Sequence, residues 1–201
     1  MKKENFTILV DMDDTIENLR EAWVEALNNK YNLNVRVKDI IDWNIQTFFP
    51  TLTKAQIFEI LDQPDFYKTI KPKKDAIKYL HLMHEEGFNL ILCTASHYSI
   101  IKEKFENALF PYFPFFDDDH IIITNNKTII KANVLIDDGV HNLLKGSYKK
   151  ILYTTSANSR FNEEEKYKIT RASTWKQIYE IVKMMYKDES EKHNRKTETK
   201  D

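Results

Sequence analysis

Phe6-Thr7-Ile8-Leu9-Val10-Asp11-Met12-Asp13-Asp14-Thr15 is the stretch that decides the fold of this chain. Its first five residues are apolar or β-prone, which is typical of a strand buried on both faces of a parallel sheet. Three carboxylates, those of Asp11, Asp13 and Asp14, follow at the end of this strand, where open α/β sheets bind ligands. Such crowding is unfavourable unless a cation or a shared proton relieves it, and oxygen ligands suit Mg²⁺. The stretch therefore predicts a magnesium site, with a simple Asp-rich turn as the alternative.

The bulk composition narrows the class of protein. A chain of 201 residues fits one domain, or one domain with a modest insertion. Its 30 basic and 31 acidic residues nearly cancel, so the net charge indicates neither polymeric nucleic acid nor a membrane as partner. Cys93 is the single cysteine, which excludes an intrachain disulfide, and no apolar run approaches the ~20 residues that span a bilayer. We therefore expect a soluble, cytoplasmic protein.

Predicted strands alternate with predicted helices along most of the chain. Apolar runs predict strands at 6–10, 88–93, 121–123, 134–136 and 150–153. This alternation is typical of an α/β fold with a doubly wound parallel sheet. Residues 18–70 lack a convincing strand, so we expect a small helical cap inserted after the first strand, with Thr15 and Thr53 as candidate N-caps. The predicted core is 1–17 and 71–186, and the charged segment 187–201 is expected to be disordered.

Polar side chains follow the predicted strands at the edge where parallel strands end. These residues are Asp11, Asp13, Thr94, Lys127, Asp137 and Asp138. The set suits phosphoryl transfer through a covalent aspartyl intermediate. One carboxylate attacks phosphorus and a second handles the proton of the leaving oxygen. A metal and a lysine neutralise the phosphoryl oxygens, and a hydroxyl positions them.

Each of these features also has a simpler interpretation when it is taken alone. Thr94 is placed to cap the next helix, and Lys131 is a rival to Lys127. Asp137-Asp138-Gly139 is an ordinary turn sequence. The order of all the features along the chain, each at a strand end, is what favours a catalytic site.

That order resembles the four motifs of the haloacid dehalogenase-like hydrolase superfamily. The motifs are Asp11-Met12-Asp13-Asp14-Thr15, Thr94, Lys127 and Asp137-Asp138, although many members have Gly where this chain has Asp14. Within the superfamily, the chain is most similar to the 5'(3')-deoxyribonucleotidase family. That closer resemblance rests on the short cap with Asp42-Trp43, on Pro64-x-Phe66-Tyr67 before Pro72, and on the spacing from Lys127 to Asp138.

The resemblance implies a role for each matching residue. Asp11 would be the nucleophile and a Mg²⁺ ligand, and Asp13 the general acid and base, with its backbone carbonyl also on the metal. Thr94 and the N–H of Ala95 would hold a phosphoryl oxygen, and Lys127 would pair with Asp11 and the phosphoryl group. Asp138 would be the remaining protein ligand of the metal. Asp137 would support the ligands without binding the metal, although the roles of the two could be exchanged.

The resemblance also implies a substrate and a pocket for it. The chain would be a Mg²⁺-dependent phosphatase of deoxyribonucleoside monophosphates, with small-molecule nucleotides as its partners. Trp43 and Phe66 in the cap would face the base, although such aromatics equally often form a cap's own core. One alternative is the same chemistry on a sugar phosphate. Others are a phospho-accepting receiver domain and a catalytically silent phosphate-binding module.

Overall fold

The computed structural model describes residues 1–198 of the chain, with side chains described as far as Arg195. Six parallel strands form one sheet, in the order β3-β2-β1-β4-β5-β6. The strands are β1 (Thr7–Val10), β2 (Asn89–Thr94), β3 (Ile121–Ile123), β4 (Val134–Asp137), β5 (Lys149–Tyr153) and β6 (Ile169–Ala172). The helices are α1 (Leu19–Tyr31), α2 (Lys54–Phe58), α3 (Ala76–Glu85), α4 (Ile101–Lys104), α5 (Val140–Leu143), α6 (Glu164–Tyr167) and α7 (Trp175–Glu198).

Short helical turns connect these elements. They are η1 (Lys3–Asn5), η2 (Val37–Asp39), η3 (Ile45–Phe48), η4 (Glu59–Asp62), η5 (Phe66–Thr69), the π-type turn η6 (Phe105–Leu109), η7 (Asp118–His120), η8 (Lys127–Ile129) and η9 (Ser156–Asn158).

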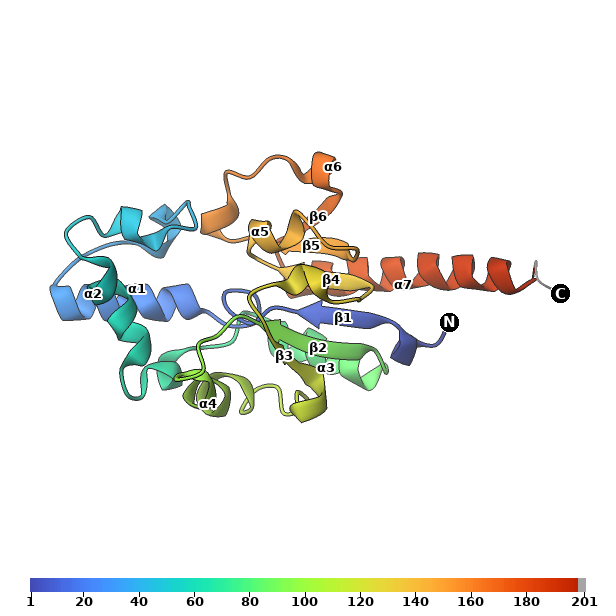
Figure 1. Cartoon of the computed structure of the whole chain (residues 1–201), viewed down its shortest axis with the longest axis horizontal. Coiled ribbons are helices and arrows are strands. Elements are labelled where there is room, and N and C mark those ends of the chain that lie inside the picture. The colour runs from blue at the N-terminus through green and yellow to red at the C-terminus, as the bar shows by residue number, and fades with distance from the viewer. Residues whose placement is uncertain (199–201) are drawn as a thin grey trace.

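Strand β1 lies in the middle of the sheet and is buried on both faces, because successive side chains of a strand point to opposite sides. Ile8 and Val10 join the larger apolar cluster, which includes residues of α3 and α7. Leu9 joins the smaller cluster with Leu135 of β4 and Leu143 of α5. Helices therefore cover both faces, and the predicted doubly wound parallel sheet is confirmed (Figure 1).

The strand order reverses between β1 and β4, and the residues that follow these two strands meet at that reversal. From β1 the chain proceeds to β2 and β3 on one side, and then to β4, β5 and β6 on the other. Asp11, the first residue after β1, is hydrogen-bonded to the neighbouring strand β4: its N–H donates to the carbonyl of Ile136 at 2.9 Å. A crevice at such a reversal is the usual ligand site of an open α/β sheet.

One strand was not predicted from the sequence. Strand β6 has only four residues, and two of them, Thr170 and Arg171, are polar. Because β6 contains no continuous apolar run, the usual sequence signal of a buried strand is missing.

Between residues 18 and 70 the structure describes helices and helical turns but no strand. This segment lies beyond the carboxyl ends of the strands (Figure 1). Thr53 forms the predicted cap of α2, in a capping box with Gln56. Thr15 does not cap α1, which begins at Leu19. Its hydroxyl instead donates to Asp11 at 3.2 Å and accepts from the N–H of Asp138 at 3.1 Å.

The C-terminal segment differs from its prediction. Disorder was expected from Lys187, but α7 continues as a helix to Glu198, and residues 199–201 lie outside the described part of the chain. Packing explains the difference, because the carboxylate of Glu189 accepts from Asn133 at 2.7 Å and lies 3.2 Å from the ammonium of Lys149. Throughout residues 1–198, no helix combines the length and the apolar character that crossing a membrane requires.

Candidate active site

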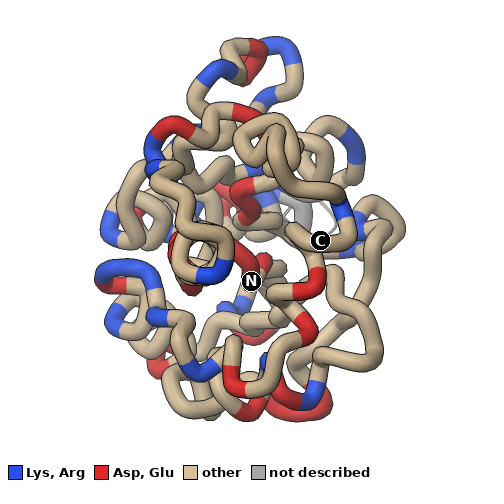
Figure 2. The backbone as a smooth tube through the Cα atoms, turned by 90° about the vertical axis from the view of Figure 1, so that its left-hand side faces the viewer, with Lys and Arg blue, Asp and Glu red and all other residues tan. Residues whose placement is uncertain are grey.

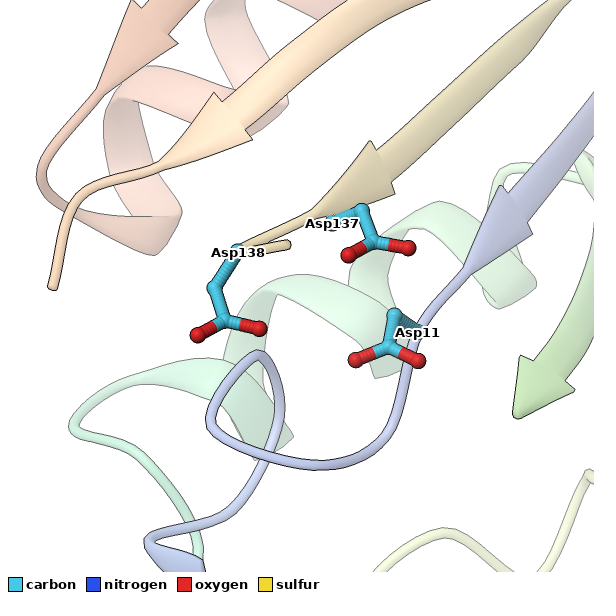
Figure 3. Close-up of side chains that lie close together, drawn as sticks. All are labelled: Asp11, Asp137 and Asp138. Atoms are coloured by element: carbon cyan, nitrogen blue, oxygen red, sulfur yellow. The ribbon is translucent and has the colours of Figure 1, made fainter. Parts of the chain in front are cut away.

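Three carboxylates converge at the strand-order reversal. Asp11 follows β1, Asp137 ends β4 and Asp138 follows it, and one oxygen of each lies within 4.8 Å of the others. All three side chains are buried and turn toward a shared space (Figure 3). Figure 2, which looks onto the left-hand side of Figure 1, shows acidic residues near the centre of the outline as well as at its edge, and most basic residues toward the edge.

Lys127 links two of these carboxylates. Its ammonium donates to Asp11 and, at 2.6 Å, to Asp137, and the side chain is only 2% exposed. Burial by itself lowers the pKa of Lys127. The attraction of the Asp11 and Asp137 carboxylates is stronger than this effect, so the pKa of the lysine is raised overall. Burial also raises the pKa of Asp11 to about 7, against the opposing effect of Lys127. The exposed Lys131, the rival in the sequence, does not take this position.

Asp137 and Asp138 differ sharply in their partners. Asp137 accepts from Lys127, from the N–H of Gly139 at 2.7 Å and from the amide of Asn142 at 3.0 Å. Neither carboxylate oxygen of Asp138 accepts a hydrogen bond from the described residues, although the side chain is 1% exposed. Burial and nearby Asp14 raise the pKa of Asp138. Bare, buried oxygens beside Asp11 are the donor set that a hard cation such as Mg²⁺ requires.

Asp13 lies outside that trio and has a cation of its own. The ammonium of Lys104, on α4, lies 2.6 and 2.8 Å from its two oxygens, and Lys104 is almost fully buried. Sequence reasoning missed Lys104, because a lone lysine on a short helix carries no motif. It also missed Glu17, whose carboxylate is 1% exposed and lies beside Asp13. Burial and nearby Asp13 raise the pKa of Glu17.

Asp14 occupies a backbone position that favours glycine. Its φ of 57° lies in the left-handed region, which Asp tolerates better than most residues. Arg20 holds it there, because the guanidinium lies 3.0 Å from one carboxylate oxygen and the backbone N–H of Arg20 donates to the other at 3.1 Å. The residue that departs from the superfamily pattern is thus accommodated by a salt bridge to the first turn of α1.

Thr94 ends β2, the neighbour of β1, and is fully buried. Its hydroxyl has no hydrogen-bond partner in the described structure, which suits a group that awaits a ligand oxygen. Ala95 follows directly. The adjacent Cys93 is part of the core, where burial raises the pKa of its thiol to about 11, so it is not suited to be a nucleophile.

The two predicted cap aromatics lie in different surroundings. Trp43 is 54% exposed and contacts the ring of His141 edge-to-face, with 4.8 Å between ring centroids. Together with Asp138, both line a cavity of about 600 Å³. Phe66 is 5% exposed, packs against Tyr67 and lines a different hollow. The structure therefore brings Trp43, but not Phe66, into one cavity with Asp138.

Comparison with known proteins identifies the family. The sequence profile of the family described as "5' nucleotidase, deoxy (Pyrimidine), cytosolic type C protein" matches residues 5–188. The chain belongs to this family. It is 30% identical to a 5'(3')-deoxyribonucleotidase of Bacillus subtilis over 179 residues, which are 89% of this chain and 97% of that protein.

Solved structures support the fold. A predicted phosphatase from Clostridium acetobutylicum superposes with a TM-score of 0.59 at 14% identity, covering 89% of this chain and 98% of that one. A haloacid dehalogenase-type hydrolase of Bacillus subtilis, bound to magnesium, superposes with a TM-score of 0.56 at 15% identity, covering 88% and 98%. The predicted resemblance to the 5'(3')-deoxyribonucleotidase family is confirmed by the family profile and the relatives. This chain is an enzyme, a phosphoric monoester hydrolase.

Proposed function

We propose that this enzyme removes phosphate from deoxyribonucleoside monophosphates with Mg²⁺ and through a phospho-aspartyl intermediate. The observation that carries the proposal is the pairing of Asp11 with Lys127 beside the bare oxygens of Asp138. The deoxyribonucleotide substrate is suggested by the names of the relatives.

The chain's own residues account for both halves of the reaction. A carboxylate oxygen of Asp11 attacks phosphorus while the bond from phosphorus to the ester oxygen breaks, and Asp13 gives that oxygen its proton. Water then attacks the aspartyl phosphate, and Asp13 takes the proton back. The products are the nucleoside and inorganic phosphate. Lys127, Thr94 and the N–H of Ala95 hold the phosphoryl oxygens throughout.

Mg²⁺ would be held by the carboxylates of Asp11 and Asp138 and by the backbone carbonyl of Asp13. When bound, it supplies positive charge that stabilises the phosphoryl oxygens. Asp137, occupied by Lys127, Gly139 and Asn142, orients the lysine instead.

Residues 18–70 act as the cap in this proposal, and residues 1–17 with 71–186 as the core. The nucleoside would lie toward the cavity of Trp43 and Asp138, whose volume of about 600 Å³ is typical of small-molecule pockets. The half-exposed indole offers a face for a base. Phe66 would support the cap from within.

The test is phosphate release from dUMP, dTMP, dGMP, the matching ribonucleotides and hexose phosphates, each with Mg²⁺ and with EDTA. We expect Mg²⁺-dependent hydrolysis that favours deoxyribonucleotides. Asp11→Asn should abolish it in a folded protein, whereas Asp118→Asn, at an exposed carboxylate, should not. A preference for hexose phosphates would refute the substrate but keep the chemistry. A folded, active Asp11→Asn variant would refute the mechanism.

A further inference from the structure

A second cavity lies beside the first motif and shares no lining residue with the Trp43 cavity. Its volume is about 560 Å³, within the usual range for small-molecule sites. Its charged lining residues are Asp14, Arg20, Glu21, Lys38, Lys73 and Lys74. We call it the lysine cavity. Arg20 stands between it and the catalytic carboxylates, because its guanidinium lies 3.7 Å from Asp138 as well as 3.0 Å from Asp14.

The lining of the lysine cavity carries a surplus of positive charge. Four of its side chains are cations and two are carboxylates. One of those carboxylates, Asp14, is already engaged twice by Arg20, through the guanidinium and the backbone N–H. Glu21 is exposed to solvent, as are Lys38 and Lys74, so these three charges are screened alike. The four cations still outnumber the two carboxylates, which makes the electrostatic potential inside the cavity positive.

Lys73 is the least solvated of these lysines. Its side chain is 13% exposed, and its ammonium lies 3.8 Å from Asp14, a distance at which only a weak contact with that shared carboxylate remains. The ammonium also lies 5.9 Å from the centre of the Tyr153 ring. Buried lysines are normally paired closely with an anion. The Lys73 ammonium, with only this long contact to a shared carboxylate, therefore has room for a further anionic partner inside the cavity.

Hydroxyl groups that follow β5 complete the wall. Thr154, Thr155 and Ser156 line the same cavity, and of these the Ser156 O–H already donates to the carbonyl of Val37 at 3.0 Å. The Thr154 oxygen accepts from Ser173 at 3.2 Å, so its own O–H can donate elsewhere. Ammonium groups as point charges and hydroxyls as donors are a common combination for binding phosphate oxygens. Lys38 and Lys74 also line the cavity and are exposed, so their ammonium groups are accessible to an anion from solvent.

We propose that the lysine cavity binds a phosphorylated small molecule with more than one negative charge, at a site separate from the catalytic carboxylates. Its volume exceeds the space that one phosphate group needs, which favours a nucleotide as the carrier of the phosphate. The proposal concerns binding and does not depend on which ester the enzyme hydrolyses.

Isothermal titration in EDTA tests the proposal, with dTTP and inorganic phosphate as the two probes. Without metal, the carboxylates of Asp11, Asp137 and Asp138 repel anions, so binding at the catalytic site is weak. We expect dTTP to bind the unmodified enzyme. The double variant Lys38→Ala/Lys74→Ala should raise its Kd by about fivefold to tenfold, the sum of two exposed charge contacts.

Two controls locate the binding. Thr94→Ala alters the catalytic phosphate position and should leave the Kd for dTTP unchanged. Lys78→Ala/Lys176→Ala removes two exposed lysines that do not line the cavity, and should also leave it unchanged. Binding of inorganic phosphate with the same pattern of variants would support the site with free phosphate as its ligand. Absence of binding, or binding weakened by Thr94→Ala but not by Lys38→Ala/Lys74→Ala, would overturn the proposal.

Discussion

Replacing Lys127 with methionine tests the charge arrangement at the centre of the site. Methionine keeps most of the side-chain volume but removes an ammonium that is 2% exposed and bonded to Asp11 and Asp137. Breaking a buried ion pair by removing one partner costs about 3–5 kcal/mol, because the remaining charge is left uncompensated. The total stability of a domain is about 5–15 kcal/mol. The variant should therefore fold but lose a large part of its free energy of unfolding.

The cost of Lys127→Met should depend on pH in a defined direction. Burial already raises the pKa of Asp11 to about 7 while Lys127 is present, and removing the lysine raises it further. A carboxyl with a raised pKa in the folded state stabilises the fold below its unfolded pKa, and that contribution is lost as the pH rises through the folded pKa. The loss of stability should thus be greatest at pH 8 and smaller by at least ~1 kcal/mol at pH 5.5.

Urea unfolding in EDTA, followed by circular dichroism at both pH values, measures this cost. The matched control is Lys131→Met, which alters an exposed lysine four residues away and should stay within about 0.5 kcal/mol of the unmodified protein. A cost for Lys127→Met below about 1 kcal/mol at pH 8 would refute the reasoning, as would a cost that increases toward pH 5.5.

Three further predictions follow from the site. Asp11→Asn should raise the free energy of unfolding in EDTA at pH 8 by about 1–3 kcal/mol, because Asn has no charge to bury. This gain should shrink as the pH falls from 7 toward 4, and urea unfolding across that range measures it. Asp138→Asn should raise the Mg²⁺ concentration for half-maximal activity by about 10–100-fold. Asp137→Asn should mainly lower the free energy of unfolding, and the reverse pattern of the two variants would make Asp137 the metal ligand. Phe66→Ala should cost about 3–5 kcal/mol of stability, and the half-exposed Trp43→Ala about 1 kcal/mol or less while raising KM, as thermal unfolding and initial rates would show.

The fold was largely predictable because its central strands are apolar runs that can be recognised in the sequence. Strand β1 is a largely apolar run that the acids Asp11 and Asp13 follow closely, and the apolar runs of β2 and β4 likewise end in a polar residue, Thr94 or Asp137. Strand β6 was not predictable, because two of its four residues are polar. The helix beyond Lys187 was missed for a different reason. Contacts of Glu189 with residues far away in the sequence stabilise it, and composition alone does not reveal them.

The site was predictable only where a residue belongs to a motif. Lys127 could be proposed because it lies between the second and fourth motifs, although Lys131 was a rival. Lys104 and Glu17 could not be proposed, because their importance comes from burial next to Asp13. Burial of a charged side chain is a tertiary property that no local pattern encodes.

The structure also explains how so many acids coexist at one sheet edge before any metal binds. Three of them each have a cation within 3.0 Å, in the pairs Asp13–Lys104, Asp14–Arg20 and Asp137–Lys127. Asp11 shares Lys127 and accepts from Thr15. Asp138 is left with a distant guanidinium at 3.7 Å and no hydrogen bond from the described residues. Since each of these other four is already engaged, we infer that an added cation would lower the free energy most beside Asp138. The partners of the two adjacent acids, rather than their spacing, thus support Asp138 over Asp137 as the proposed metal ligand.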